Sequence, residues 1–414
     1  MRKNSPTFSS AIGALALLVS AFSSVASAAT PAKSYFLYVG SYTRVTGKGI
    51  YGFRYTPATG DMAPLGLIQE VVNPGWLSET PDHRFIYASS DGPGAKNFTI
   101  SAFARDAKTG ALTLLNAVPS RGDGPVQMTV ANTGKALVVA NFGSAGVAPT
   151  VVSFPILTDG RLGEAVSRFA EEGVAEGPAV PRDANGNSPT DTHDHCIIRS
   201  PDSRFVLVCN LGLGKVYVYR LNSATGVLER NGEPFVVPSP TGGKSRPHHL
   251  TFSANGKFVY ILDGDMAVVT AAYDATHGKL KAIQTQPVVA APPPGANTLS
   301  GSEIIADPTG RAVYISARSV DKTLKNVLVE GSINVFAVNP RNGKLKPVQQ
   351  LSSGGFAPRT FVLDPTGRYL LMANQLSGAI TVFAVDKKTG ALSPTGRNLK
   401  DVPEPGDFLF EAEK

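Results

Sequence analysis

The stretch AKTGAL at residues 107–112 is one copy of a turn motif that recurs along the whole chain. The copies, in some of which single positions vary, are PATGDM (57–62), AKTGAL (107–112), LTDGRL (157–162), SATGVL (223–228), ATHGKL (275–280), PRNGKL (340–345) and KKTGAL (387–392). Each follows a strand-like segment such as VYVYRL at 216–221. Asp or Asn before Gly is typical of tight hairpins. The seven copies, mostly about fifty residues apart, therefore predict seven repeats of one β-unit.

A second turn motif supplies the other half of each repeat. Its copies are TPDHRF (80–85), ANTGKA (131–136), SPDSRF (200–205), SANGKF (253–258), DPTGRA (307–312) and DPTGRY (364–369). An apolar strand follows each copy, for example YLLMAN at 369–374. One repeat thus reads strand, turn, strand, loop, strand, turn, strand, which is a four-stranded antiparallel meander. The predicted fold is all-β, a seven-bladed β-propeller.

Six copies of the second motif against seven of the first indicate that one blade combines both ends of the chain. Residues 35–42 and 49–55 are expected to pair with a last strand near 407–410, which closes the ring and removes exposed sheet edges. An open β-solenoid is the alternative architecture. The WD40 type of propeller is disfavoured, because Trp76 is the sole tryptophan and no Trp-Asp pair occurs.

The first 28 residues have the features of a secretory signal peptide. Arg2 and Lys3 precede an apolar run at 11–22, and Ala26-Ser27-Ala28 fits a cleavage site. We expect residues 29–414 to form one propeller domain that is secreted or periplasmic and not membrane-bound once the signal is removed; an uncleaved N-terminal anchor is the alternative. The net charge of +7, or +5 without Arg2 and Lys3, comes from scattered residues and indicates no nucleic-acid partner. The oligomeric state is not specified.

Polar residues gather at one predicted end of the propeller channel. In a meander the first strand begins where the second strand finishes, so the residues at both registers share one mouth. First strands begin at Trp76, Gln127, His195, His248-His249, Glu303 and Arg359, and second strands end at Ser90, Asn141, Asn210, Asp263, Ala317-Arg318 and Asn374. Long loops at 171–194 and 287–302 feed the same mouth. We therefore expect the functional site there.

Each of these residues also has a purely structural interpretation. The Asn and Asp residues that end second strands are common turn formers. Glu303 and Arg359 are compatible with an ion pair that lines the channel, and His195 with a wall histidine. Trp76 and Gln127 are expected to be wall fillers.

His193-Asp194-His195 suggests a metal site, because alternate strand residues share a face. By the same alternation His248 and His249 should point to opposite faces, so only one of them would join. We therefore expect no metal ion and no other cofactor.

Cys196 and Cys209 are predicted to lie opposite each other on neighbouring strands. A four-residue turn at 201–204 sets this register. A bridge in that geometry is usually strained, so two buried thiols are favoured over a disulfide.

The chain resembles the β-propeller lactonase family, which includes propeller-type 6-phosphogluconolactonases and fungal 3-carboxymuconate cyclases. The resemblance covers about residues 35–410 and is most specific at HDHCIIRSPDSRFVLVCNLGLGKVYVYRL (193–221) and GFAPRTFVLDPTGRYLLMANQLSGAITVF (355–383). By this resemblance, the family's functional residues match His193, His195, Glu303, Arg359 and His249 here.

The chain also departs from the family pattern. Where the family has Gly-Pro-Arg-His, this chain has Arg246-Pro247-His248-His249, so His248 replaces the arginine and Arg246 would have to compensate. A family glutamate is absent from Asp263-Gly264-Asp265, and Gln127 stands where a histidine is common. The missing glutamate argues most against cyclase chemistry.

The resemblance and the predicted mouth together give a functional hypothesis. We expect hydrolysis of a small lactone that bears an anionic group, with His195 as general base, Glu303 orienting that histidine or the water, and Arg359 holding the anionic group or the developing oxyanion. The residues expected to bind substrate are His193, Arg246, His248, His249, Asn210, Asp263 and Arg318. The alternatives are a non-catalytic propeller that binds a ligand or protein, and a cyclase-type isomerase.

Overall fold

The computed structural model describes Met1 and residues 33–91, 98–143, 150–170, 192–240, 242–289, 298–321 and 327–414. The expected signal peptide and most of both long loops, 171–191 and 290–297, lie outside these described residues. The described residues from 33 to 414 form one compact unit. Among the described residues, no helix is both long and apolar enough to cross a bilayer.

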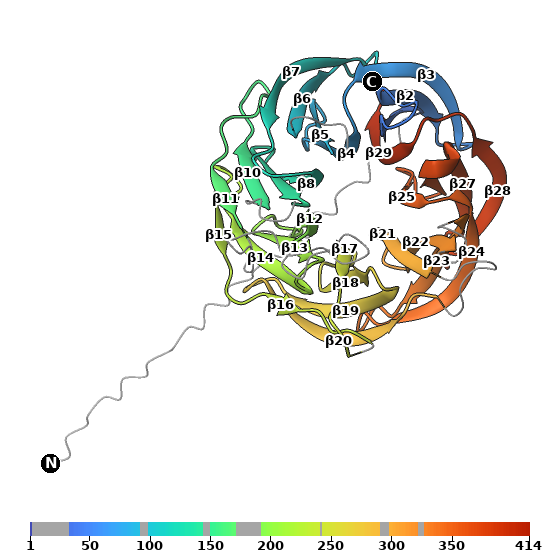
Figure 1. Ribbon diagram of the computed structural model, residues 1–414. Coiled ribbons are helices and arrows are strands. Elements are labelled where there is room, and N and C mark those ends of the chain that lie inside the picture. Colours follow the sequence, from blue (N-terminus) through green and yellow to red (C-terminus); the bar gives the residue numbers. More distant parts are fainter. Residues whose placement is uncertain are drawn as a thin grey trace. The chain divides into compact units, whose positions relative to one another are not determined.

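Seven antiparallel sheets are arranged in a closed ring, with one strand of each sheet on its inner side (Figure 1). From inner to outer strand, the sheet that joins the two ends of the chain contains β29 (Pro405–Ala412), β1 (Tyr35–Ser41), β2 (Gly49–Thr56) and β3 (Asp61–Glu70). The second sheet contains β4 (Pro74–Glu79), β5 (Phe85–Ser90), β6 (Thr99–Arg105) and β7 (Leu112–Pro119). The third sheet contains β8 (Pro125–Val130), β9 (Ala136–Asn141), β10 (Val151–Pro155) and β11 (Ser167–Phe169). The fourth contains β12 (Asp194–Arg199), β13 (Phe205–Asn210) and β14 (Lys215–Leu221), with the outer position shared by β15 (Leu228–Arg230) and β16 (Phe235–Val236).

The last three sheets complete the ring. They contain β17 (Pro247–Phe252), β18 (Phe258–Asp263), β19 (Ala267–Asp274) and β20 (Lys279–Pro287); β21 (Thr298–Ala306), β22 (Ala312–Asp321), β23 (Val327–Val338) and β24 (Leu345–Phe356); and β25 (Pro358–Leu363), β26 (Tyr369–Asn374), β27 (Ala379–Val385) and β28 (Leu392–Leu399). A short 3-10 helix, η1 (Gln375–Ser377), follows β26. The predicted seven-bladed propeller is confirmed, as is its closure, since β29 pairs with β1.

The core lies between the blades. Each of seven hydrophobic clusters in the described part of the chain takes its side chains from two neighbouring sheets, and the cluster between the chain-joining sheet and the next one contains the fully buried aromatics Phe36, Tyr38 and Phe103. Inner strands contact each other in turn around the ring, from β29 through β4, β8, β12, β17, β21 and β25 and back to β29. Because every sheet has a partner on both faces, burial of aromatic and aliphatic surface holds the ring together.

All seven glycines of the first turn motif have positive φ, as their role in tight turns requires. At Gly110, where φ is +72°, a Cβ would come within 2.6 Å of the Phe36 ring in the neighbouring blade. The Tyr38 hydroxyl donates a hydrogen bond of 2.7 Å to the Gly110 carbonyl. The turn that defines the sequence repeat therefore also joins one blade to the next.

Candidate active site

Every inner strand carries a β-bulge where it enters the channel mouth. Between its paired positions, each inner strand has one more residue than its neighbour, for example at Asp194–Cys196 in β12 and at Pro247–His249 in β17. The same shift occurs in β4, β8, β21, β25 and β29. A bulge interrupts the alternation of side chains and re-aims one of them. The propeller thus directs a ring of bulged residues to one end of its channel.

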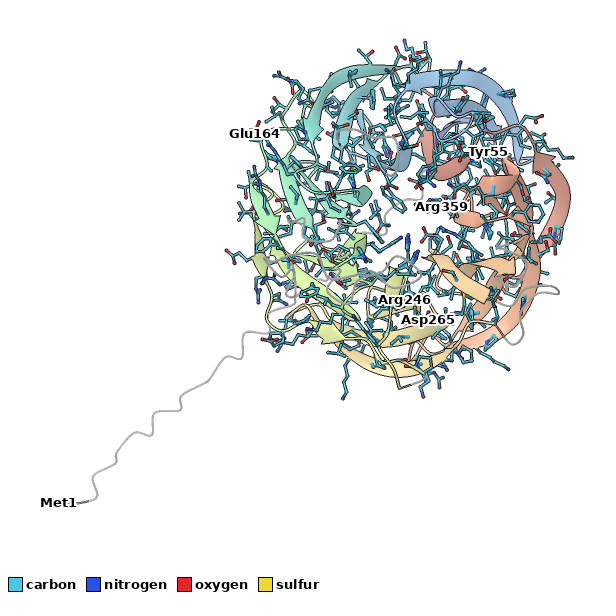
Figure 2. All side chains as sticks on the ribbon, in the orientation of Figure 1. Met1, Tyr55, Glu164, Arg246, Asp265 and Arg359 are labelled. Carbon is cyan, nitrogen blue, oxygen red and sulfur yellow. The ribbon has the colours of Figure 1, made fainter. Side chains whose placement is uncertain are left out.

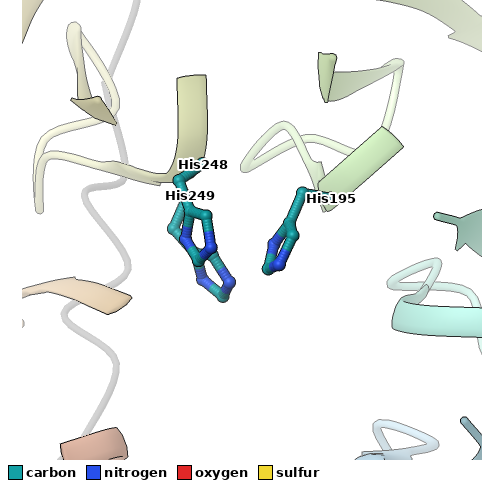
Figure 3. A group of neighbouring side chains, drawn as sticks. All are labelled: His195, His248 and His249. Carbon is teal, nitrogen blue, oxygen red and sulfur yellow. The ribbon is translucent and has the colours of Figure 1, made fainter. Parts of the chain in front are cut away.

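Three histidines meet at this bulged ring. Figure 3 shows His195 of β12 facing His248 and His249 of β17. The ring centroid of His195 lies 3.7 Å from the ring centroid of His248 and 5.1 Å from that of His249. The ring centroids of His248 and His249 are 4.9 Å apart. The expectation that His248 and His249 point to opposite faces is therefore wrong. The bulge at Pro247–His249 breaks the alternation on which it rested.

Hydrogen bonds fix two of these rings. Nδ1 of His248 lies 3.1 Å from the Ser302 carbonyl, and Nδ1 of His249 lies 2.9 Å from Oε1 of Glu303. A carbonyl and a carboxylate only accept, so both Nδ1 atoms carry the proton and Nε2 is the remaining nitrogen of each ring. In contrast, Nδ1 of His195 has no hydrogen-bond partner among the described residues.

Glu303 forms a hydrogen bond with His249. From the sequence, Glu303 was expected to orient His195 or the attacking water instead. Oε1 of Glu303 accepts from His249 and also from the Ile304 amide at 2.8 Å. Burial lowers the pKa of His249, but the charge of Glu303 and its hydrogen bond outweigh burial, so this pKa is raised overall. His249 and Glu303 therefore form a buried ion pair that spans two blades.

The other two rings of the cluster favour the neutral form. Burial is the largest cause that lowers the pKa of His195 well below its usual value, and His249 and Arg359 add to it. For His248, burial is again first, followed by repulsion from His195 and His249. His195 is thus a neutral imidazole at neutral pH, in the protonation state that a proton acceptor needs.

Two arginines stand beside the histidines. Nε of Arg318 donates to Oγ of Ser302 at 3.1 Å, and Ser302 donates to the Arg359 carbonyl at 2.7 Å. Burial lowers the pKa of Arg318 to about 9, helped by repulsion from Arg359. Burial also opposes the charged form of Arg359, but Tyr42 and nearby carboxylates raise its pKa overall. Nε of Arg359 has no hydrogen-bond partner within the described ranges.

A cavity of about 380 Å³ opens next to this cluster, large enough for a small organic ligand. It is lined by Tyr42, Arg44, Asp91, Phe98, Asp123, Gly124, Val126, Phe142, Gly143, His195 and Arg359. A narrower space adjoins it, lined by Gly75, Trp76, Val126, His195, His248, His249, Ser302, Arg318, Arg359 and Thr360. His195 and Arg359 line both spaces, so a ligand in the larger cavity lies against both side chains.

Several expected substrate contacts lie elsewhere. Asn210 donates to Asp194 and accepts from the Leu213 amide, and Asp263 accepts from Ser245 and from the Arg246 and Asp265 amides, so both hold loops. Figure 2 shows Arg246 beside Asp265, and the two side chains form an exposed ion pair of 3.7 Å. Arg246 does not line the described cavities, and Arg318 lies beside His248 in the narrower one.

The remaining sequence candidates form the wall. His193 stacks on Phe142 with ring centroids 4.1 Å apart. The Trp76 indole donates to the Met128 carbonyl at 3.1 Å, and the Gln127 amide oxygen accepts from Ile197 at 2.6 Å. Trp76 and Gln127 thus occupy the wall positions that were expected for them.

Tyr42, Arg44, Asp91 and Asp407 were not proposed for the site from the sequence. Two guanidinium groups approach the Tyr42 ring, with Arg359 5.0 Å and Arg44 4.4 Å from the ring centre, and the Tyr42 hydroxyl donates to Asp91. Asp407 accepts from the Leu77 amide at 2.7 Å, and burial raises its pKa to about 7. Tyr42 follows the second strand of the blade that joins the chain ends, and Asp407 lies near the start of its first strand. Both residues therefore lie at the end of the blade where first strands begin and second strands finish.

The two cysteines lie under the cluster. Cys196 and Cys209 are paired in register across β12 and β13, as predicted, and both are free, fully buried thiols. The sulfur of Cys196 accepts from the Leu250 amide at 3.4 Å, one residue beyond His249.

Comparison with known proteins identifies the family. A profile described as "Lactonase, 7-bladed beta-propeller" matches residues 36–410, nearly the whole described propeller. The chain belongs to this lactonase family. It is 30% identical over 362 residues to a 6-phosphogluconolactonase of Bacillus subtilis, covering 87% of this chain and 93% of the relative. A 6-phosphogluconolactonase of Formosa agariphila is 26% identical over 365 residues, covering 88% and 96%.

A solved structure gives the same result. The periplasmic gluconolactonase of Pseudomonas aeruginosa aligns with a TM-score of 0.78 and 27% identity, covering 92% of this lactonase-family chain and all of that one. The resemblance inferred from the sequence is thus confirmed at the level of the family.

Proposed function

We propose that this protein hydrolyses a small lactone at the mouth of the propeller channel. The observation that carries the proposal is that His195 and Arg359 line one cavity of about 380 Å³ in a chain of the lactonase family, with Arg318 in the narrower space that adjoins it. The named relatives are lactonases, so a purely binding propeller and a cyclase-type isomerase are not favoured.

The proposed mechanism starts with a water molecule between His195 and the lactone carbonyl. His195, whose side chain lines the cavity, takes a proton as the water oxygen attacks. The carbonyl oxygen then bears negative charge, which the guanidinium of Arg359, with Arg318 beside it, stabilises. Collapse breaks the ring C–O bond, and the proton returns from His195 to the ring oxygen, so lactone and water yield one hydroxy acid.

The other groups position these three. Glu303 holds His249, and Ser302 links Arg318 to the strand of Arg359 through its hydroxyl. The two arginines also support the finer proposal that the substrate carries an anionic substituent. Asp91 and Asp123 in the larger cavity are acceptors for ligand hydroxyl groups, as an aldonolactone would present.

Export is part of the proposal. We infer that residues 1–28 are a cleaved signal peptide and that the mature protein acts in the periplasm or outside the cell. The support is the leader pattern and the similarity to a periplasmic gluconolactonase. N-terminal sequencing of the secreted protein tests this, and a chain that retains Met1 would contradict it.

A pH-indicator screen tests the enzymatic proposal. The protein is mixed with aldonolactones with and without a phosphate or carboxylate group, and acid release is followed against spontaneous hydrolysis. His195→Gln serves as the site variant and His277→Gln as the matched control, because His277 is exposed on a turn and pairs only with Asp274 among its described ionic partners. We expect acid release that only His195→Gln abolishes. Release in no member of the panel, or equal release by His195→Gln, would refute the proposal.

A further inference from the structure

The three histidines at the channel mouth form a set of nitrogen donors that the proposed hydrolysis does not require as a set. One donor atom from each of His195, His248 and His249 lies within 4.8 Å of the others. Imidazole nitrogen is a preferred donor for zinc and other divalent transition metals, and three histidines with an open fourth position are a known type of zinc site. We propose that this cluster binds one divalent transition-metal ion, with zinc as the test ion.

Hydrogen bonds to the far side of the rings support this proposal. A metal-bound histidine usually donates its other N–H to a carboxylate or backbone carbonyl, which fixes the ring and leaves the opposite nitrogen for the metal. His249 has such a bond to Glu303, and His248 has one to the Ser302 carbonyl. His195 has a ring nitrogen with no partner in the described part of the chain. Two rings are therefore pre-oriented, although the ion has to displace the proton on Nε2 of His249, and the third ring is available.

The distances require only small ring movements. Nitrogens around a tetrahedral zinc ion lie roughly 3.4 Å apart, given a Zn–N distance of about 2.1 Å. The donor atoms here lie within 4.8 Å of one another, and the rings of His195 and His248 are 3.7 Å apart at their centroids. Rotation of the His195 ring, whose Nδ1 has no hydrogen-bond partner among the described residues, brings its nitrogen toward the other two. The larger cavity, which His195 lines, leaves the fourth position open to water or a ligand.

The bulge in β17 brings His248 into the set. The bulge at Pro247–His249 turns His248 to the same side as His249, and the ring centroids of the two histidines are 4.9 Å apart. Arg318 and Arg359 oppose a cation at this place. The Glu303 carboxylate offsets part of that repulsion through His249, and the bond to the metal comes from nitrogen lone pairs rather than from net charge.

A second possible group, Glu79, His83 and Glu411, is less suited to a metal. Its buried carboxylate, Glu411, already has a cationic partner, because Nη2 of Arg105 lies 3.2 Å from Oε2 of Glu411. His83 is half exposed and also pairs with Glu79. Zinc bound at this second group has to be distinguished from zinc bound at the three histidines, which the His83→Gln variant does.

Metal binding and proton transfer use the same side chain. A nitrogen of His195 that coordinates zinc no longer accepts a proton, so zinc is expected to inhibit hydrolysis. Metal binding is measured directly as zinc bound per chain, so its test does not depend on whether the protein hydrolyses a lactone.

The test is a metal titration of the full chain after treatment with a chelator. Zinc is added, free metal is removed by gel filtration, and bound metal is measured by mass spectrometry, while Co²⁺ is used as a spectroscopic probe of tetrahedral nitrogen coordination. The variants are His248→Arg, which introduces the family's residue, and His195→Gln. His83→Gln and His277→Gln are the controls. Circular dichroism checks that each variant is folded.

We expect about one zinc ion per chain and a cobalt spectrum of tetrahedral type. His248→Arg and His195→Gln should each weaken binding about tenfold or more, whereas both controls bind as the unaltered protein does. No retained zinc in the unaltered protein overturns the proposal. Equal binding by His248→Arg, or loss of binding in His83→Gln alone, overturns it as well.

Discussion

Nδ1 of His249 lies 2.9 Å from Oε1 of Glu303, and this contact joins the inner strands of two neighbouring blades. Both residues are buried, so the pair is screened little by solvent. The same carboxylate oxygen accepts from the Ile304 amide, which holds the Glu303 side chain against its own strand. The pair therefore positions His249 relative to His195 and Arg359 without itself reaching the larger cavity.

Replacement of Glu303 tests this positioning role. Glu303→Gln removes the charge that favours the His249 imidazolium, so we expect kcat for lactone hydrolysis to fall about 10- to 100-fold with little change in KM. Glu303→Asp keeps a carboxylate and should recover part of kcat. Steady-state kinetics with the best substrate of the screen measures both variants. A loss confined to KM, or no recovery by Asp, would contradict the role.

His195 should be the most sensitive residue for turnover. His195→Gln keeps a polar side chain of similar length but removes the base, and kcat/KM is expected to fall by at least about 10²-fold. Melting temperature, compared with that of His277→Gln, shows whether the fold is intact. A variant that melts normally and retains most of its activity would exclude His195 as the base.

The strand order and most registers could be predicted from the sequence. The seven turn glycines and the apolar strands after the second motif define the blades, and the same register places Cys196 opposite Cys209. These inferences hold because hairpin turns specify which residues face each other within one blade. Tyr42 and Asp407 were within reach of the same rule, had it been extended to the blade that joins the chain ends.

The side-chain directions at the mouth could not be predicted in the same way. Strict alternation separates His248 from His249 and gives no reason for Glu303 to contact His249. The bulge at the start of each inner strand removes that alternation. No single residue type in Pro247–His249 or Asp194–Cys196 predicts a bulge there. The site depends on the irregular positions of an otherwise regular repeat.

Arg318 and Arg359 should differ in their effects. Arg359 lines both spaces, so Arg359→Lys, which loses the planar guanidinium, is expected to lower kcat about 10²- to 10³-fold. Arg318 lines only the narrower space, and Arg318→Lys should have a smaller effect on kcat. Parallel kinetics of the two variants provides the comparison. A larger effect at Arg318 would move the oxyanion contact to that residue.

Asp407 should make stability depend on pH. Burial raises its pKa to about 7 in the folded protein from 3.8, so the folded state holds a proton that the unfolded state has released. Stability from this group is present below about pH 4 and is lost as pH rises through about 7. Asp407→Asn keeps an acceptor for the Leu77 amide, so its stability relative to the unaltered protein should increase by up to a few kcal/mol over that range.

Urea unfolding at about pH 5 and pH 8 measures the difference, with the exposed Asp401→Asn as control. A difference between Asp407→Asn and the unaltered protein that does not change with pH would show that Asp407 is ionised throughout.

The contact of Gly110 with the neighbouring blade should contribute to the stability of the propeller. Gly110→Ala must place a Cβ 2.6 Å from the Phe36 ring and adopt a φ of +72°, whereas Gly367→Ala has a similar φ of +62° with nothing within 4 Å. Both should lose about 1–2 kcal/mol from the left-handed backbone. Gly110→Ala should lose at least about 1 kcal/mol more, because Phe36 fills the interface between two blades. Urea unfolding of the two variants measures this difference, and equal losses would mean that the turn contributes only its backbone shape and not the contact between blades.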